Sequence, residues 1–562
     1  MNINIMNQNP DYLTIKSDST LKDALEVIEN GQERLCFIVD NNLVLIKVIS
    51  DGDVRRALLK GFTLDDKIDS IHDRTPVIVR EGCDIIQATE KMSEKITVLP
   101  ILNSKNQIKG ILRKRDIMPF IDIRSREILI VGMGYVGLTL ALVLADNNFS
   151  VIGYDNNKKL INDLLNKKTL MHEKGIDNFI NTQIGHNLSL VNSLDGVNAD
   201  IHIISVGTPI NKDNYEPIMT HLNSAVESVA KILKKFDLVI LRSTVPIGST
   251  REIVLPLLEE KSGLQGSKDF FLAFCPERTI EGSALAELRK LPQIIGGLCK
   301  KSTELASRLF NENTHTVIDV GTLEAAEMAK LIDNTYRDTI FSYSNQMALI
   351  SEKVGVNLPE LIDRVNLGYE RNKVPKPSPG VGGPCLSKDP YILNNTFIKH
   401  GLKAEVSMAA REVNKNSIIN MFNRTQKLFE TLNKNIIDSK IFLLGFAFKG
   451  HPETNDLRDS TTIDFLNQLI NNGAKNIFGF DPVIPANELE FLNINTCSIE
   501  EGFNNADAVF IMNNHRSFSE LKINQLADAM NSPAILFDCW HTFQANEINS
   551  LPNIIYSGIG IG

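Results

Sequence analysis

The stretch that decides the fold covers residues 128–145 and reads ILIVGMGYVGLTLALVLA. Gly132, Gly134 and Gly137 form a GxGxxG pattern that follows a β-branched run and precedes a helix-like run. Such a pattern allows a tight turn, close approach of a pyrophosphate and close packing of helix on strand. The next predicted strand ends at Asp155, 23 residues after Gly132, where a carboxylate can accept both ribose hydroxyls and repel a 2′-phosphate. The stretch therefore predicts a Rossmann fold that binds NAD rather than NADP.

The same 18 residues carry no charge, which is the lower limit for a membrane-spanning segment. The glycines interrupt the run in its middle, however, at the positions of the dinucleotide-binding pattern. We therefore expect a buried strand followed by a buried helix, and no association with a membrane.

Length and composition limit the class of protein. The 562 residues favour three or four domains, and 43% hydrophobic with 23% charged residues is ordinary for globular proteins. A net charge of −9 argues against a nucleic-acid binder, because such proteins carry a basic surplus. The seven cysteines include no CxxC pair, so neither a disulfide framework nor a metal site is expected. The N-terminus lacks a signal-peptide pattern, and we expect a cytoplasmic protein.

Strand-like and helix-like patterns alternate after residue 127, which is typical of a parallel sheet with crossover helices. The predicted strands are Ile128–Val131, Val151–Tyr154, Ile201–Val206 and Leu238–Leu241. The pattern becomes mainly helical from Leu323 to about Glu430, and a second alternating region starts at Lys440. We therefore expect an α/β protein with four units, at residues 1–122, 123–322, 323–435 and 436–562.

The N-terminal unit contains a weak internal repeat, displaced by 63 to 64 positions. The corresponding positions are Leu21 and Ile85, Ala24 and Ala88, Val48-Ile49 and Ile111-Leu112, and Asp53 and Asp116. This repeat resembles a tandem pair of cystathionine-β-synthase-type (CBS) domains, which often bind adenine nucleotides in the clefts between their halves.

In that family a Ser or Thr three residues before an Asp contacts the ribose. The resemblance implies a regulatory adenine nucleotide at Ser50, Asp53 and Asp116, although the second half has Arg113 in place of the Ser or Thr. The alternative is that both aspartates only cap helices, because Asp is a favoured N-cap residue.

Two further turns directly follow predicted strands. Gly207, Thr208 and Pro209 follow one strand, and Ser243 and Thr244 follow another. Because ligands bind at the carboxyl ends of the strands of a doubly wound sheet, we expect both turns beside the nicotinamide half of the cofactor. The alternative is ordinary turns made of Gly, Pro, Ser and Thr.

The segment PSPGVGGPCLSKDP, residues 377–390, places three glycines directly before Cys385, and Lys388 and Asp389 after it. A glycine-rich loop lets a substrate approach the backbone, a nearby cation lowers the pKa of a thiol, and a carboxylate can activate water. A single cysteine is more often a small buried hydrophobe. The setting of this one nevertheless favours a nucleophile.

From about Ile128 to its end, the chain resembles the nucleotide-sugar dehydrogenase family, which includes UDP-glucose, UDP-N-acetylhexosamine and GDP-mannose dehydrogenases. The matching stretches, in order, are VGMGYVGLTLA, SVGTP, RSTVPIGST, FCPERTIEG, EMAKLIDNTYR, GVGGPCLSKDP, LLGFAFKGHPETNDLRDS and FGFDP. The resemblance implies two Rossmann-like domains, one for NAD and one for the nucleotide sugar, joined by a long central helix that mediates dimerisation. It also implies a homodimer or a higher homo-oligomer.

The chemistry implied by this resemblance is a four-electron oxidation of the sugar C6 alcohol to a carboxylate, with two NAD⁺ and no release of the aldehyde. Cys385 would form a thiohemiacetal and then a thioester, while Lys330 and Asn334, on one helix face, would stabilise the oxyanion. Asp389 and a water held with Thr244 would move protons and hydrolyse the thioester. The implied catalytic residues are Cys385, Lys330, Asn334, Asp389, Thr244, Glu277 and Glu281.

The resemblance also implies the binding contacts. Those to the cofactor are Gly132, Gly134, Tyr135, Val136, Gly137, Asp155, Gly207, Thr208, Pro209, Ser243, Thr244 and Lys388. Those to the substrate are Glu277, Lys330, Asn334, Gly382, Lys449 and Arg458. Ordinary alternatives are a solvated helix face at Lys330 and Asn334, and a surface ion-pair cluster of Arg458 with Asp456 and Asp459.

The identity of the sugar depends on smaller signals. The PER sequence and FKGHPETNDLRDS resemble the N-acetylhexosamine branch, whereas Lys388-Asp389 resembles the UDP-glucose and GDP-mannose branches. Pro384 departs from the residues common before the cysteine. We favour a UDP-N-acetylhexosamine, with UDP-glucose as the alternative. An alternative of another class is a non-catalytic nucleotide-sensing protein, which would have no need of the Cys385 thiol.

Overall fold

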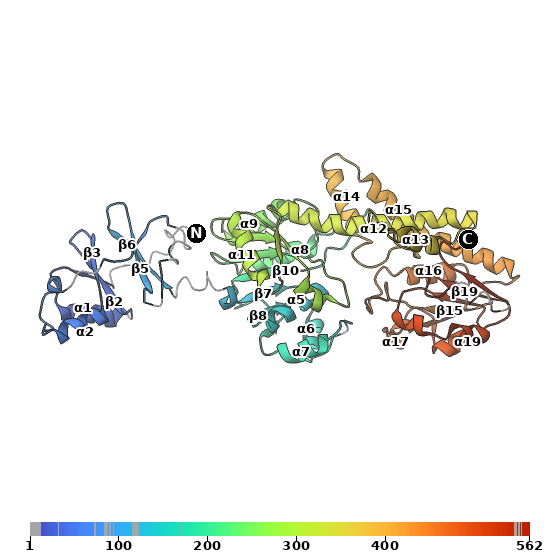
Figure 1. Cartoon of the computed structure of the whole chain (residues 1–562), viewed down its shortest axis with the longest axis horizontal. Helices are drawn as coiled ribbons and strands as arrows, with labels where there is room; N and C mark the ends of the chain where they lie inside the picture. Colours follow the sequence, from blue (N-terminus) through green and yellow to red (C-terminus); the bar gives the residue numbers. More distant parts are fainter. Residues whose placement is uncertain are drawn as a thin grey trace. The chain divides into compact units, whose positions relative to one another are not determined.

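The computed structural model of the chain describes residues 13–31, 33–71, 75–83, 88, 91–93, 95–114, 123–169, 171–371, 373–544, 548, 551 and 553–562. It divides into two compact units, Met1–Ser125 and Arg126–Gly562 (Figure 1), which are described separately.

The second unit begins with an eight-stranded sheet in the order β14-β13-β12-β11-β10-β7-β8-β9. Its strands are β7 (Ile128–Val131), β8 (Val151–Tyr154), β9 (Leu188–Val191), β10 (Ile201–Ile204), β11 (Leu238–Leu241), β12 (Phe271–Phe274), β13 (Gln293–Gly297) and β14 (Val317–Asp319). The first six are parallel, and the chain reverses direction across the sheet between β7 and β10. β13 pairs antiparallel to β12. The first six strands therefore have the Rossmann order, with its switch point beside β7.

The apolar stretch 128–145 divides as expected into β7 and α5 (Tyr135–Asp146), both buried. Other helices of this part are α6 (Lys158–Leu165), α7 (Ile176–Gln183), α8 (Thr220–Ala230), α9 (Leu255–Ser262), α10 (Ala284–Lys290) and α11 (Lys300–Asn311). No helix found among the described residues is both long enough and apolar enough to cross a membrane.

A 32-residue helix, α12 (Leu323–Val354), runs from this sheet to the second sheet of the unit (Figure 1). The Thr322 side chain caps its start, and it ends at Gly355, whose positive φ of 72° suits glycine. It packs against α14 (Asp389–Lys399) and α15 (Glu405–Thr431), and α13 (Leu358–Asn366) follows it. This helical region thus connects the two sheets, as the sequence predicts.

The last part of the chain forms a six-stranded parallel sheet in the order β17-β16-β15-β18-β19-β20. The strands are β15 (Lys440–Leu444), β16 (Asn476–Phe480), β17 (Asn495–Thr496), β18 (Ala508–Ile511), β19 (Ala534–Asp538) and β20 (Ile554–Ser557). The helices are α16 (Thr461–Asn471), α17 (Ala486–Glu490), α18 (Ile499–Phe503) and α19 (Ile523–Asp528). Phenylalanines from three elements, Phe465, Phe510 and Phe537, meet in its core. Two Rossmann-like sheets joined by helices confirm the predicted fold class.

The first unit contains two three-stranded sheets built alike. β1 (Thr14–Lys16), β2 (Leu35–Val39) and β3 (Leu45–Ser50) form one, and β4 (Val79–Arg80), β5 (Val98–Leu102) and β6 (Ile108–Arg113) form the other. In each, the first pair is parallel and the second antiparallel. The antiparallel register shifts between Ile38 and Val39, and again between Ile101 and Leu102, at equivalent positions of the repeat.

Helices α1 (Leu21–Gly31) and α2 (Asp51–Leu59) accompany the first sheet. Side chains of the two halves share an apolar cluster, which includes Phe37 and Val39 from the first and Val98 and Leu102 from the second. The repeat that the sequence indicates is therefore present as two matching halves with a common interior.

Candidate active site

The three glycines after β7 have distinct surroundings. Gly132 has a positive φ of 96°, which an L side chain rarely adopts. A Cβ atom on Gly137 would lie 1.8 Å from the carbonyl oxygen of Gly132, so only glycine allows the helix to pack this closely on the strand. At Gly134, by contrast, a Cβ would meet no described protein atom within 4 Å. The open side of the turn is therefore at Gly134, where a pyrophosphate would approach.

A cavity of about 280 Å³ lies at this turn and extends to Asp155, Gly207 and His221. The Asp155 carboxylate accepts a hydrogen bond from the backbone nitrogen of Met133 at 2.9 Å and is thus held beside the turn. An open glycine turn, a helix N-terminus and a carboxylate at the end of the second strand fit the pyrophosphate and ribose of NAD. When bound there, NAD⁺ would supply a hydride acceptor.

Of the other expected cofactor contacts, Tyr135 has a second role. Its hydroxyl donates to the Glu173 carboxylate and accepts from the backbone nitrogen of Gly282 at 2.9 Å, so it fixes the loop that carries Glu281. Val136 is half-buried in the first turn of α5, where its backbone is part of the helix N-terminus.

The turns after β10 and β11 are joined to the catalytic loop. The Thr208 hydroxyl donates to the carbonyl oxygen of Thr244, and the Ser243 hydroxyl donates to that of Val206 at 2.6 Å. Lys388 donates from Nζ to the carbonyl oxygen of Thr208 at 3.1 Å. The structure thus brings both turns together with Lys388 beside the cofactor cavity, while Pro209, next to Thr208, is exposed.

Cys385 faces a second cavity of about 320 Å³, which is formed by three parts of the unit. The loop after β12 contributes Glu281, the helix α12 contributes Arg337, and the C-terminal domain contributes Lys449. Gly382 lies in the wall, and a Cβ on it would lie 2.5 Å from the carbonyl oxygen of Asp459. The glycine loop therefore fits tightly against the C-terminal domain and presents the thiol to the cavity.

The electrostatics of Cys385 differ from the sequence-based expectation. The side chain is exposed to the cavity but surrounded by the protein beyond it, and this burial raises the pKa of the thiol above its usual value. Lys330 and Lys388 lower the pKa, whereas Asp389 and Glu281 raise it. The expected lowering of the pKa by nearby cations is therefore present, but burial outweighs it and the pKa is raised overall. The thiol needs a base to become a thiolate near neutral pH.

A buried network lies behind the thiol. Lys330 is 7% exposed and donates to the backbone carbonyl of Glu277 at 2.5 Å, and Asn334 is 3% exposed. The amide nitrogen of Asn334 donates to the fully buried carboxylate of Asp389 at 2.5 Å, and Arg337 donates to the amide oxygen of Asn334 at 2.9 Å. A solvated helix face at Lys330 and Asn334 is therefore excluded.

The two glutamates of the PERTIE segment have different surroundings. The Glu277 carboxylate pairs with buried Arg242 and accepts from the backbone nitrogen of Thr279 at 2.6 Å. Burial would raise its pKa, but these partners outweigh burial and hold the pKa below its usual value. Glu277 is not among the residues that line the described part of the Cys385 cavity, and its expected role near sugar C6 stays a prediction. Its backbone carbonyl, however, positions Lys330.

Glu281 lies in the wall of the Cys385 cavity. Burial and the Asp456 carboxylate raise its pKa to about 7, against the lowering effects of Arg458 and Lys449. Lys449 donates to the backbone carbonyl of Glu281 at 2.6 Å, and burial lowers the pKa of Lys449 to about 8. Two groups that titrate near neutral pH therefore meet beside the thiol, which is the arrangement expected for proton transfer.

Arg458 forms the expected ion pair with Asp456 and also reaches a residue of the cavity wall. Its guanidinium pairs with Asp456 at 2.5 Å and is 63% exposed, as in a surface ion pair. It also reaches the Glu281 carboxylate at 3.4 Å, at the edge of the cavity. Asp459 instead accepts from the hydroxyl of Ser387 at 2.7 Å and supports the glycine loop.

Sequence reasoning missed several residues of this site. Arg337 and Phe341 line the cavity and continue the face of Lys330 and Asn334 at helical spacing, so the i, i+4, i+7, i+11 pattern could have revealed them. Glu327 was also missed. It is buried and accepts from the backbone nitrogens of Gly248 at 2.6 Å and Thr250 at 2.8 Å, an interaction between distant segments. Within the described part of the chain, no group of His, Cys, Asp and Glu could hold a metal ion.

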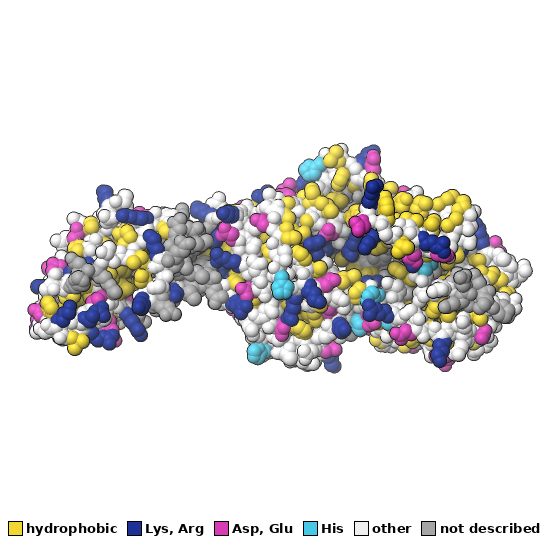
Figure 2. All heavy atoms as spheres, viewed as in Figure 1, with side chains coloured by type: hydrophobic (Ala, Val, Ile, Leu, Met, Phe, Trp, Pro, Cys, Tyr) yellow, Lys and Arg dark blue, Asp and Glu magenta, His cyan; other side chains and the backbone are white. Residues whose placement is uncertain are grey.

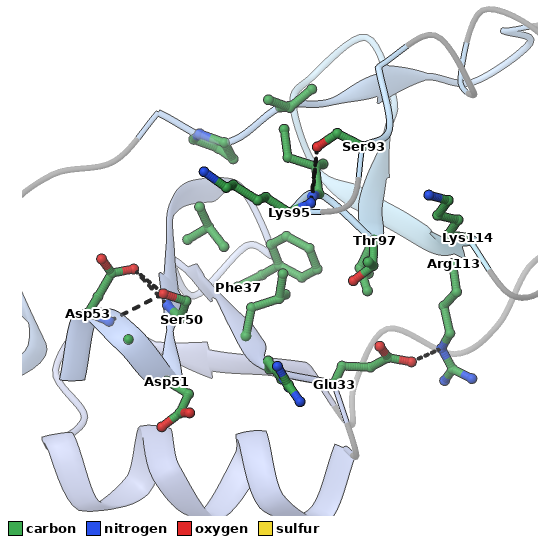
Figure 3. Close-up of a pocket in the computed structure, with 18 of the residues that line it drawn as sticks. Glu33, Phe37, Ser50, Asp51, Asp53, Ser93, Lys95, Thr97, Arg113 and Lys114 are labelled. Atoms are coloured by element: carbon green, nitrogen blue, oxygen red, sulfur yellow. Dashed lines mark hydrogen bonds and ion pairs between the residues drawn. The ribbon is translucent and has the colours of Figure 1, made fainter. Parts of the chain in front are cut away.

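The expected regulatory residues lie in the first unit. Ser50 caps α2, and its backbone nitrogen and hydroxyl donate to the Asp53 carboxylate at 2.9 and 2.6 Å. Asp53 therefore takes part in the helix cap, but as the N3 residue of a capping box rather than as the N-cap residue, which is Ser50. Both residues also line a cavity of about 1040 Å³ (Figure 3). Asp116 lies outside the described residues.

A glycine turn at the switch point of a Rossmann sheet, close to a thiol with titratable neighbours, defines an NAD-dependent oxidoreductase. Models of the UDP-glucose/GDP-mannose dehydrogenase family match the NAD binding domain at residues 126–314, the central domain at 324–416 and the UDP binding domain at 442–545. The chain belongs to this family and is an NAD-dependent nucleotide-sugar dehydrogenase. A CBS domain model matches residues 4–60 and 68–122, so the first unit is a CBS pair.

Relatives share most of the dehydrogenase part. The UDP-N-acetyl-D-mannosamine dehydrogenase of Campylobacter jejuni is 32% identical over 410 residues, which are 71% of this chain and 98% of that protein. An NDP-N-acetyl-D-galactosaminuronic acid dehydrogenase of Ralstonia nicotianae is 30% identical over 412 residues, 72% of this chain and 95% of that protein. The solved UDP-D-ManNAc dehydrogenase of Pyrococcus horikoshii is 29% identical, with a TM-score of 0.70 over 78% of this chain and 99% of that one.

Proposed function

We propose that the protein oxidises the C6 hydroxymethyl group of a UDP-N-acetylhexosamine to a carboxylate, with Cys385 as the covalent nucleophile. The observation that carries this proposal is the position of the thiol, which opens to a cavity formed by all three parts of the dehydrogenase. An enzyme that transfers a single hydride has no use for a thiol there.

The residues of the site have different roles in the two halves of the proposed reaction. In the first half, the C6 alcohol loses a proton and a hydride, and Glu281, with its pKa near 7, takes the proton. Glu281 passes this proton to solvent and takes the proton of the Cys385 thiol, whose sulfur adds to the aldehyde carbon, and Lys330 stabilises the resulting oxyanion. Lys330 is suited to this because its ammonium group is buried and held by a carbonyl oxygen.

In the second half, the thiohemiacetal loses a second hydride and becomes a thioester. A water, positioned by Asp389 and Thr244, attacks the thioester carbon, breaks the bond to sulfur and releases the carboxylate. The thiol recovers its proton, and NAD⁺ held at the glycine turn would supply the acceptor for each of the two hydrides. Asp389 fits this role because its carboxylate lies four residues after the thiol and is fixed by Asn334.

The identity of the sugar is proposed from the PER segment and from the relatives, several of which are UDP-N-acetyl-D-mannosamine dehydrogenases. The second candidate is UDP-glucose, which the Lys388-Asp389 pair favours. NADH formation should be measured with UDP-N-acetylmannosamine, UDP-N-acetylglucosamine, UDP-N-acetylgalactosamine, UDP-glucose and GDP-mannose. We expect the highest kcat/KM with one of the N-acetylated substrates. The highest value with UDP-glucose would establish the second candidate instead.

The substrate is proposed to bind through the C-terminal domain. Lys449 would approach the diphosphate from the cavity wall and Arg458 from its edge, where it already contacts Glu281. We assign residues 123–322 to NAD binding, 323–435 to the central and catalytic-loop domain, 436–562 to nucleotide-sugar binding and 1–122 to regulation. We also place the protein in the cytoplasm, where an accessible thiol such as Cys385 stays reduced.

A homodimer through α12 completes the proposal. Exposed apolar residues repeat along this helix at Met328, Ile332, Tyr336, Tyr343, Met347, Ile350 and Val354. At about 100° per residue they share one face, opposite to the face of Lys330 and Asn334. Figure 2 shows apolar side chains gathered over the long helices of the second unit. Such a stripe on a two-sided helix fits a second copy of the same chain.

The CBS pair is proposed to bind an adenine nucleotide at Ser50 and Asp53 and to change the rate of the dehydrogenase. Support comes from the cavity that these residues line. AMP, ADP and ATP should be titrated during turnover of the full-length enzyme and of its Ser50→Ala variant. A change of rate in the wild type that is weaker in the variant is expected. Equal responses of the two proteins would contradict the proposal.

A further inference from the structure

The cavity of the CBS pair has two chemically different ends (Figure 3). Ser50 and Asp53 lie at one end, Arg113 and Lys114 lie at the other, and Phe37 lies between them. Its volume of about 1040 Å³ is at the upper limit of what small-molecule sites usually offer. One ligand could therefore contact both ends.

The difference between the ends follows from the repeat. Ser50 ends β3 opposite Leu35, and Arg113 ends β6 opposite Val98, at the equivalent register position. The first half thus presents a hydroxyl where the second half presents a guanidinium. A hydroxyl next to a carboxylate suits the hydroxyl groups of a ribose, whereas a guanidinium suits an anion. The two halves therefore do not offer two equal nucleotide sites.

Arg113 is paired, at its own end of the cavity, with a residue of the other half (Figure 3). Its Nε lies 3.1 Å from the carboxylate of Glu33, and the two side chains are only 14% and 11% exposed. A pair with so little exposure is screened less than a surface pair, and a competing anion can replace the carboxylate only if it binds the guanidinium at least as well. A phosphate meets this requirement, because it binds guanidinium through two parallel hydrogen bonds.

We propose that one nucleotide binds across this cavity, with its ribose at Ser50 and Asp53 and its phosphate at Arg113, which exchanges Glu33 for the phosphate. The inference rests on the proposed nucleotide function of the CBS pair. Lys114 lies beside Arg113 and Lys95 lies over the Ser50 end, so both add positive charge to the phosphate path. The exchange breaks an ion pair between the halves and so couples ligand binding to their mutual contact.

The test compares AMP with adenosine, which lacks the phosphate. The full-length protein is titrated calorimetrically with each compound while saturating UDP occupies the nucleotide-sugar site and Gly134→Ala, present in every protein compared, weakens the dehydrogenase's own NAD site. One equivalent of AMP per chain is expected. Arg113→Gln should weaken AMP binding about tenfold or more, because a charge-assisted bond is lost, and should leave adenosine binding within about twofold. Glu33→Gln should strengthen AMP binding several-fold, because no ion pair then has to break.

Two variants serve as references. Ser50→Ala should weaken the binding of AMP and of adenosine to the same extent, because both compounds contain the ribose. Arg55→Gln changes a cation that also lines the cavity but pairs with Asp51 on its own helix, and it should have little effect. If Arg113→Gln lowers the affinity for AMP and Glu33→Gln raises it, these opposite effects cannot result from a general loss of folding.

Two equivalents of AMP, or equal effects of Arg113→Gln on AMP and adenosine, would overturn the exchange. The exchange would also be overturned if Ser50→Ala weakened AMP binding but Arg113→Gln and Glu33→Gln did not change it. That result would leave the nucleotide function intact. If the protein with an unaltered CBS pair binds neither compound under these conditions, the proposed nucleotide function itself fails, and the exchange fails with it.

Discussion

The amide of Asn334 is fixed at both ends, because its nitrogen donates to Asp389 at 2.5 Å and its oxygen accepts from Arg337 at 2.9 Å. Asn334 lies on α12 and Asp389 begins α14, so this single side chain joins the central helix to the catalytic loop. One of the two N–H groups of the Asn334 amide is therefore committed to Asp389, and we infer that this bond holds the carboxylate in place. The expected contact of Asn334 with the oxyanion stays a prediction for its second N–H group.

Replacing Asn334 should therefore impair the step that depends on Asp389. Asn334→Ala removes a partner of a buried carboxylate, and we expect kcat to fall by about tenfold to a hundredfold, with a smaller change in KM. Asp389→Asn should have the larger effect, because it removes the base itself. Steady-state kinetics of both variants checks this order. Thr339→Ala, which loses only a bond to the backbone of its own helix, is the control. An Asn334→Ala enzyme with unchanged kcat would refute the positioning role.

The pH profile should reflect Glu281 and Lys449. Because the pKa of Glu281 is raised to about 7, its carboxylate becomes available as a base only as the pH rises through 7. Lys449, whose pKa is lowered to about 8, loses its charge as the pH rises through 8. The rate should therefore rise and then fall over this window. Glu281→Gln should lower kcat by about a hundredfold and remove the rising limb. A variant that keeps that limb would show that another group is the base.

Two glycines of the dinucleotide turn should respond differently to the same change. Gly137→Ala places a methyl group 1.8 Å from the Gly132 carbonyl oxygen and should destabilise the protein by about 3 kcal/mol or prevent its folding. Gly134→Ala meets no described protein atom within 4 Å, so its melting temperature should stay near that of the wild type. Its affinity for NAD⁺, measured by fluorescence titration, should fall at least about tenfold, because the methyl group occupies the pyrophosphate side. Equal stability of the two variants would contradict the packing argument.

The apolar stripe of α12 should determine the oligomeric state. Tyr336 is 64% exposed in the middle of the stripe, and Tyr336→Glu would bury a charge in a dimer interface. Analytical ultracentrifugation should show a dimer for the wild type and monomers for this variant at micromolar concentration. Phe491→Glu changes an apolar residue that is 85% exposed away from the helix, and it should remain dimeric. A dimeric Tyr336→Glu protein would place the interface elsewhere.

Much of the fold could be predicted from the sequence. β7, β8 and β11 have the predicted bounds, and β10 ends two residues early at Ile204. These strands are buried and bounded by glycine, proline or aspartate, so their pattern is clear. Strands such as β13 and β14 were missed, because short apolar runs cannot be distinguished from helical segments by periodicity. The antiparallel pairing of β13 with β12, and the parallel pairing of β14 with β13, depend on contacts between distant segments.

The residues of the candidate site could be predicted from the sequence, but the shifts of their pKa values could not. The order of motifs identifies Cys385, Lys330 and Asp389, and the structure brings them together. The buried Arg242 that neutralises Glu277 is 35 residues away in the chain, and no spacing rule links the two. The raised pKa of Cys385 likewise depends on burial by three domains, which a local pattern of cations near a thiol cannot reveal.

The most direct test of the account is the yield of NADH and uronate with and without the thiol. With a UDP-N-acetylhexosamine as the substrate, the wild type should form two NADH for each uronate and release no aldehyde. Cys385→Ala should form no uronate at a measurable rate, because the second hydride transfer requires the thiohemiacetal. Two NADH per uronate at the wild-type rate in Cys385→Ala would contradict the covalent role of Cys385.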